Sequence, residues 1–154
     1  MSHAAGINIT ISSSAKSILE LIEILLNNGW SVKDHGHISY LPLGDEDAFN
    51  WQHVAIATWP NIVETLKQKE KNRELIGLVM TWKDTNIGGE FLFFPDGQQL
   101  AVNWSVNRKA LKHCADFTDQ SWYLTRILTP LLKACIVIES VQCYDSACPL
   151  MVNI

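Results

Sequence analysis

Three consecutive segments between residues 75 and 106 constrain the fold of this chain more than any other feature. Residues 75–82 (LIGLVMTW) form an uninterrupted apolar run of strand length, typical of a strand that is central in a sheet or covered on both faces. Residues 89–94 (GEFLFF) and 98–106 (QQLAVNWSV) flank a Pro-Asp-Gly turn, and the second of them alternates apolar and polar residues. The three segments predict an antiparallel β-meander.

A glycine pair, Gly88 and Gly89, stands at the start of the middle segment and raises the alternative of a ligand-binding loop. A glycine-rich phosphate loop has spaced glycines that lead into a helix, with a lysine or an acidic partner at a set position. Here the pair leads into a strand. We therefore expect a β-bulge or a tight turn, and the nucleotide interpretation fails.

Helical periodicity marks two segments in the first half of the chain. Apolar residues at helical spacing predict a helix over residues 18–26, which Gly29 would terminate. Pro60 can occupy the first turn of a second helix that carries Leu66 on its apolar side. The end of that helix, residues 67–74 (KQKEKNRE), is expected to be too polar for burial.

A third helix is predicted within residues 117–132. Thr118 and Asp119 are candidate N-caps, and Tyr123 begins an apolar stripe at helical spacing. Pro130 is expected to kink or shorten this helix, because proline removes a backbone hydrogen bond from a helix interior.

Strand patterns account for much of the remaining sequence. Alternation predicts a first strand at residues 7–12, and a turn signal near residue 35 predicts a hairpin over residues 30–43. Residues 53–59 fit either a short strand or the start of a helix, and residues 135–144 predict a last strand.

Length and element order together predict the fold class. The chain has 154 residues, 47% of them apolar, which suffices for one sizeable core. Adjacent strand segments favour antiparallel pairing. We expect an α+β fold, with about three helices packed on a mostly antiparallel sheet, in a single globular domain over residues 1–154.

The net charge, the lengths of the apolar runs and the N-terminal stretch argue against several classes of protein. A net charge of −4 and a pI near 5.7 argue against broad binding to DNA, RNA or an anionic membrane surface. No apolar run approaches the roughly 18 residues of a spanning helix, and the N-terminal stretch MSHAAGINIT does not have the pattern of a signal peptide. We therefore expect a cytoplasmic protein with neither a nucleic acid nor a membrane as partner.

The cysteines support the same compartment. All of them lie in the last third of the chain, whereas a secreted disulfide framework spreads them through a shorter sequence; they are Cys114, Cys135, Cys143 and Cys148. We expect reduced thiols. A zinc site at Cys143 and Cys148 is disfavoured, because no matching His/Cys pair exists elsewhere.

An acidic cluster, Asp45, Glu46 and Asp47, is the first candidate for partner binding. It has neither the arrangement of a paired-carboxylate hydrolase nor the spaced oxygen ligands of a calcium loop. A solvated loop is the plain interpretation. The sharper hypothesis is an acidic rim, formed with Asp84 and Asp96 in other loops, that steers a basic protein partner.

Tryptophan is the second candidate. Six tryptophans are many for this length, and large aromatic side chains supply both core area and interface hot spots. Most are expected in the core. Trp51 and Trp59 lie in and near the least regular region and are predicted to contact a partner.

A catalytic or metal site is the alternative from a different class. His35, His37 and His53 could supply metal ligands, and Cys114 beside His113 could be a thiol nucleophile. None of these residues has an established ligand or triad spacing, so we expect no metal and no other cofactor.

Two stretches resemble a known group of proteins: LVMTWKDTNIGGEFLFFPDGQQLAVNWSVNRK and FTDQSWYLTRILTPLL. They resemble small bacterial immunity proteins of contact-dependent growth inhibition and polymorphic-toxin systems, over roughly residues 75–135. The resemblance implies an acidic, cytoplasmic, single-domain α+β protein that occludes the active site of a cognate toxin, often a nuclease with a basic face. Interfaces differ between cognate pairs, so the resemblance assigns no binding residue.

The sequence therefore favours a protein-binding module with a basic toxin domain as partner. The first alternative is a small metal-dependent or thiol enzyme that uses the histidines or Cys114. The second is a self-associating subunit, such as a homodimer, that pairs through an exposed strand edge.

Overall fold

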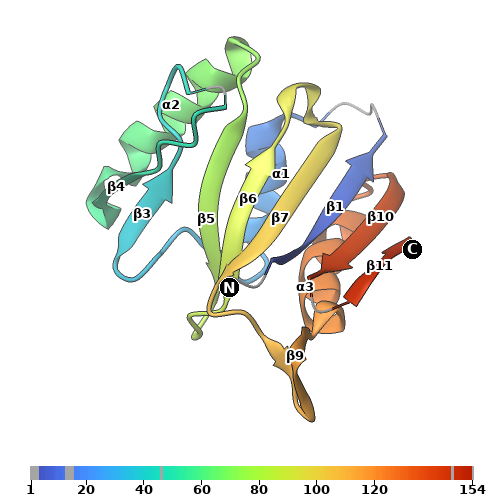
Figure 1. Ribbon diagram of the computed structural model, residues 1–154. Coiled ribbons are helices and arrows are strands. Elements are labelled where there is room, and N and C mark those ends of the chain that lie inside the picture. Colours follow the sequence, from blue (N-terminus) through green and yellow to red (C-terminus); the bar gives the residue numbers. More distant parts are fainter. Residues whose placement is uncertain (1–3, 13–15, 46, 147, 154) are drawn as a thin grey trace.

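An antiparallel β-sheet forms the centre of the computed structural model, which describes residues 4–12, 16–45, 47–146 and 148–153 (Figure 1). In the described residues the strand order across the sheet is β11-β10-β1-β7-β6-β5-β3-β4, with β2 paired to β5. The strands are β1 (Ala5–Ile11), β2 (Trp30–Ser31), β3 (His37–Tyr40), β4 (Gln52–Ala55), β5 (Ile76–Trp82), β6 (Gly88–Phe93), β7 (Gln99–Val106), β10 (Ile138–Asp145) and β11 (Cys148–Asn153). A separate small hairpin consists of β8 (Ala110–Leu111) and β9 (Cys114–Thr118).

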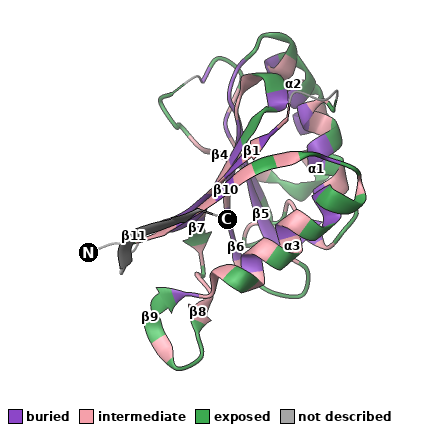
Figure 2. Cartoon of the chain, turned by 90° about the vertical axis from the view of Figure 1, so that its right-hand side faces the viewer, coloured by how far each residue is buried: buried purple, intermediate pink, exposed green. Residues whose placement is uncertain are grey.

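Helices cover one face of this sheet. They are α1 (Ile18–Leu26), α2 (Trp59–Lys71) and α3 (Gln120–Lys133), with 3₁₀ turns η1 (Ile56–Thr58) and η2 (Pro95–Gly97). Figure 2 shows α1, α2 and α3 on the same side of the sheet, so the opposite face is free of them. The predicted fold class, α+β with helices on a mostly antiparallel sheet, is confirmed.

The main core lies between the helices and the sheet. Strand alternation sends one set of side chains to this side, among them Ile7, Ile9, Leu78, Met80, Phe91, Phe93, Leu100 and Val102, all of which are buried. The stripe predicted on α3 meets them through Tyr123, Ile127 and Leu131. A smaller cluster of Leu41, Leu75 and Leu92 lies outside the main core, and Trp51 packs on it.

The predicted meander is present as β5, β6 and β7, and the glycine pair has the predicted bulge. The register between β6 and β7 shifts between Gly88 and Glu90. A Cβ atom at Gly88 would overlap the carbonyl oxygen of Met80, and one at Gly89 would overlap that of Asn103. The two glycines therefore allow close backbone approach within the sheet, as in other bulges.

The predicted hairpin over residues 30–43 is wrong. The turn itself forms, with reciprocal backbone hydrogen bonds between Asp34 and His37. However, β2 and β3 both pair with β5, at Trp30↔Trp82 and Tyr40↔Leu78. Strand β3 instead forms a hairpin with β4. Of the predicted segment 53–59, the first part therefore belongs to a strand, and the rest forms η1 and the first residue of α2.

The expectation that residues 67–74 are too polar for burial is confirmed for Lys67, Gln68, Lys71, Asn72 and Arg73, which are exposed, and is wrong at two positions. Lys69 and Glu74 are both buried. Burial is possible because the lysine ammonium has backbone carbonyl and carboxylate partners, which satisfies the charge that desolvation would otherwise penalise.

Helix α3 begins at the predicted N-cap Asp119, whose carboxylate accepts the N–H of Trp122. It continues through Pro130 to Lys133. The β8–β9 hairpin and β11 were not predicted from the sequence.

Candidate functional site

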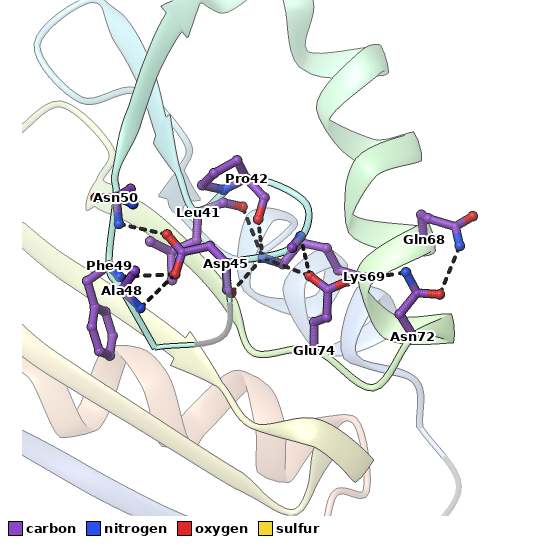
Figure 3. A network of polar contacts seen from close by, with 11 residues as sticks. Leu41, Pro42, Asp45, Ala48, Phe49, Asn50, Gln68, Lys69, Asn72 and Glu74 are labelled. Atoms are coloured by element: carbon purple, nitrogen blue, oxygen red, sulfur yellow. Dashed lines mark hydrogen bonds and ion pairs between the residues drawn. The ribbon is translucent and has the colours of Figure 1, made fainter.

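A loop anchored by a buried lysine is the best-defined feature that faces solvent at the end of β3. We call residues 41–45 and 47–50 the anchored loop. Lys69, on α2, has no exposed side-chain surface, and its Nζ donates to the carbonyl oxygen of Pro42 at 2.7 Å. Weaker contacts reach the carbonyl oxygens of Leu41 at 3.3 Å and Asp45 at 3.4 Å (Figure 3). The helix therefore fixes the course of the loop backbone.

Glu74 completes the anchor from the other side of the ammonium group. Its Oε1 lies 3.7 Å from Lys69 Nζ and accepts the backbone N–H of Gly44 at 2.7 Å. Its Oε2 accepts from Asn72 Nδ2 at 3.2 Å. Burial lowers the pKa of Lys69, while the carboxylates of Glu74 and Asp45 act in the opposite direction.

Asp45 is turned into the loop and is only 6% exposed. Its Oδ1 accepts the N–H groups of Ala48 at 3.1 Å and Phe49 at 3.0 Å, and its Oδ2 accepts that of Asn50 at 2.7 Å. Such carboxylate-to-backbone bonds hold a turn in one conformation. Asp45 thus shapes the loop and does not present its charge to solvent.

The anchored loop displays two large apolar side chains. Leu43 is 51% exposed and Phe49 is 45% exposed. Asp47 is exposed beside them. Apolar groups on a backbone that is already ordered lose little conformational entropy on binding, which makes them suitable anchors for a protein partner.

The other predicted contact residues lie in different places. Glu46 lies outside the described residues. Asp84 is exposed in the β5–β6 turn, at the end of the meander opposite the anchored loop. Asp96 is in the β6–β7 turn and pairs with Arg73 at 2.6 Å. Figure 1 shows this turn at the same end of the sheet as the anchored loop. The predicted rim residues are therefore distributed over both ends of the sheet.

The two predicted tryptophans also separate. Trp51 is half-buried on the helix-free face, against the small apolar cluster under the anchored loop. Trp59 begins α2 and packs against the main core. Trp51, but not Trp59, is thus part of the helix-free face.

Trp51 also lines a pocket of about 290 Å³ on that face, which we call the sheet-face pocket. Its polar lining residues are Asp34, Ser39, His53, Glu90 and Ser105. Ser39 Oγ lies 2.7 Å from Asp34 Oδ2 and 2.7 Å from His53 Nδ1. The polar lining residues come from the turn before β3, from β3 itself, and from β4, β6 and β7.

Donor chemistry assigns the proton positions in this pocket. An ionised carboxylate only accepts, so the Ser39 hydroxyl donates to Asp34 and accepts from His53 Nδ1–H. In the tautomer with this proton on Nδ1, Nε2 of His53 is a hydrogen-bond acceptor. Ser39 is 1% exposed and gives its proton to Asp34, so this arrangement is not that of an activated serine nucleophile.

The residues of the enzyme alternative do not converge on one site, although Ser39 and Asp34 link His53 to His35. Of the three histidines, His53 bonds Ser39, His35 contacts Asp34 in the turn, and His37 is exposed at the start of β3. Cys114 begins β9 in the separate hairpin. Within the described parts of the chain, no three His, Cys, Asp or Glu side chains form a group that could hold a metal ion.

Several residues of these two sites were missed from the sequence. Lys69 and Glu74 lie in a run of charged and polar residues, a pattern that predicts exposure to solvent. Ser39 and Glu90 are single polar residues in short strands, and only the strand register brings them to one face. The alternation of Ile38 and Ser39 was the one local signal that Ser39 points away from the main core.

No protein-family model matches this chain, and neither the curated proteins nor the solved structures include a significant match. None of the described helices combines the length and apolar character needed to cross a membrane.

Proposed function

We propose that this chain is a protein-binding module, an immunity protein that acts in the cytoplasm and neutralises a cognate toxin by covering its active site. The observation that carries the proposal is the anchored loop. Buried Lys69 and inward-facing Asp45 fix its backbone, and the loop exposes Leu43, Phe49 and Asp47. This combination of ordered backbone and exposed apolar groups fits an interface.

Charge supports a basic partner. The chain carries a net charge of −4, and Asp47 is exposed at this end of the sheet. Asp96 lies at the same end, but its carboxylate is already paired with Arg73. A toxin that binds a polyanionic substrate, such as a nuclease, has a basic face of complementary sign. Asp84 lies at the opposite end and is not part of the proposed interface.

The proposal is tested by capture followed by a toxicity assay. Tagged wild-type protein and its Phe49→Ala and Asp47→Lys variants are incubated with lysate of the source cells and washed at increasing salt. Retained polypeptides are identified by mass spectrometry and expressed alone or with each form of the chain.

The proposed function predicts a basic polypeptide that arrests growth when expressed alone and is neutralised by the wild type. Neutralisation should weaken with Phe49→Ala and Asp47→Lys. A Leu132→Ala variant, which alters an exposed apolar residue on α3, is the matched control and should neutralise fully. A captured polypeptide that is harmless, or that is retained equally by all variants, contradicts the proposal.

A further inference from the structure

The sheet-face pocket has features that the anchored loop does not explain. Asp34 and Glu90 line it with carboxylates, and among its described lining residues there is no lysine or arginine. Asp34 is already engaged by the hydroxyl of Ser39 and by His35 Nδ1 at 2.8 Å. Glu90 is different.

Glu90 is a half-buried carboxylate on β6, opposite Val79 on β5 and Asn103 on β7. Within the described residues Glu90 has no hydrogen-bond or ion-pair partner. Burial raises the pKa of the Tyr144 phenol, and the negative charge of Glu90 adds to this effect, so the neighbouring phenol stays neutral and gives Glu90 no counter-charge. A cation from outside the chain could therefore pair with this partly desolvated carboxylate.

Trp51 indicates which kind of cation the sheet-face pocket would bind. Its ring forms a wall of the same pocket, so a cation that enters meets an aromatic surface and a carboxylate. A guanidinium group is planar, weakly hydrated and rich in donors, so it can stack on an indole while it donates to several acceptors. Glu90 and His53 Nε2 are acceptors available for it, and about 290 Å³ accommodates the group with its alkyl stem.

We propose that the sheet-face pocket binds a guanidinium group. Two sources share this chemistry: an arginine side chain of a protein partner, or a free small molecule such as arginine. The first source rests on the proposed function, because the pocket adjoins the anchored loop through Trp51. In that case an arginine of the toxin would insert beside the loop.

The test is a titration followed by NMR, using the indole N–H signal of Trp51 and the backbone amides of His53 and Glu90. The probes are N-acetyl-arginine amide, free L-arginine, N-acetyl-lysine amide and N-acetyl-citrulline amide. Citrulline has nearly the shape of arginine without the charge. Saturable shifts at these residues with the arginine probes, and none with citrulline, are the expected result.

Variants separate the pocket from general electrostatic attraction. Glu90→Gln keeps the size of the side chain and should weaken arginine binding about tenfold, since it removes one charge-assisted hydrogen bond. Trp51→Leu should weaken it as well. Glu64→Gln removes an equal charge from an exposed position on α2 and should leave binding unchanged.

The titration distinguishes the two sources of the guanidinium group and can also overturn the proposal. Tighter binding of N-acetyl-arginine amide than of free arginine assigns the site to a protein side chain, and the reverse order assigns it to a small molecule. Equal shifts with citrulline, or an unchanged affinity in Glu90→Gln, overturn the proposal. Because the titration needs no protein partner, its failure leaves the anchored loop as an interface, whereas failure of the capture experiment leaves the titration result intact.

Discussion

The indole Nε1 of Trp30 donates a hydrogen bond to the backbone carbonyl oxygen of Arg126 at 3.0 Å. This carbonyl lies four residues before Pro130, which has no N–H to give it. Trp30 therefore supplies the donor that proline removes from α3, and its ring also packs edge-on against Trp82 and Phe91. The helix can run on to Lys133 because this carbonyl is satisfied from another element.

The first prediction is an energetic coupling between Trp30 and Pro130. Trp30→Phe leaves the Arg126 carbonyl unsatisfied and should cost about 1–3 kcal/mol beyond the loss of packing. In a Pro130→Ala background the backbone N–H at position 130 can take over, so the same change should cost about 1 kcal/mol less. Urea unfolding of the two single variants and the double variant measures the coupling. Strictly additive free energies would show that Trp30 does not compensate for the N–H that Pro130 lacks.

The second prediction concerns the lysine anchor. Lys69→Met leaves the Glu74 carboxylate buried without its cation and should destabilise the protein by about 3–5 kcal/mol. Adding Glu74→Gln should recover part of that loss, because no uncompensated charge remains. Lys67→Met alters an exposed lysine on the same helix and should change stability by less than about 0.5 kcal/mol. Similar unfolding midpoints for Lys69→Met and Lys67→Met would contradict the anchoring role.

The third prediction concerns the order of the loop. Asp45→Ala removes the acceptor of three backbone N–H groups, so the amide protons of Ala48, Phe49 and Asn50 should exchange faster. Asp47→Ala, at an exposed position of the same loop, should leave their exchange rates unchanged. Hydrogen exchange followed by NMR measures both. Protection that persists in Asp45→Ala would mean that the carboxylate does not hold the turn.

The fourth prediction is a loss of stability at alkaline pH. Burial raises the pKa of the Cys143 thiol above its ordinary value of 9.0. Between these two pKa values the folded state binds more protons than the unfolded state. The thiol's contribution is therefore complete below pH 9 and is lost as the pH rises through the raised pKa.

Other buried groups act in the same range. Burial likewise raises the pKa of Tyr123 and Tyr144 above 10.0, which adds a later decline, whereas the lowered pKa of Lys69 makes its contribution rise with pH. The difference between wild type and Cys143→Ala cancels these shared terms. That difference in unfolding free energy should shrink as the pH rises above about 9, and a difference independent of pH would contradict the assignment.

The fold could be predicted from local patterns to a considerable extent. Alternation at residues 98–106 and the apolar run at 75–82 identified the meander, and the stripe through Tyr123 identified the buried side of α3. These patterns are sufficient because strand and helix periodicity directly determine which side chains share a face. The hairpin over residues 30–43 failed because its turn signal was correct but did not determine which strand pairs with which.

The candidate site was predictable only in part. The loop around Asp45 was identified, but the inward orientation of that carboxylate depends on backbone N–H groups three to five residues away. Burial of Lys69 could not be inferred from a charged run, since it requires carbonyl groups from a loop 27 residues earlier in the chain. The pairing of Ser39 with His53 depends on the register between β3 and β4, which no local pattern determines.

The central claim is that the anchored loop is the interface for a protein partner, and the dissociation rate of the captured partner tests it most directly. Surface-immobilised wild type, Phe49→Ala and Leu132→Ala are compared at one salt concentration. Phe49→Ala should dissociate about 30-fold faster, as expected for loss of an aromatic hot spot worth about 2 kcal/mol, while Leu132→Ala should match the wild type. Equal dissociation rates for wild type and Phe49→Ala would contradict the claim.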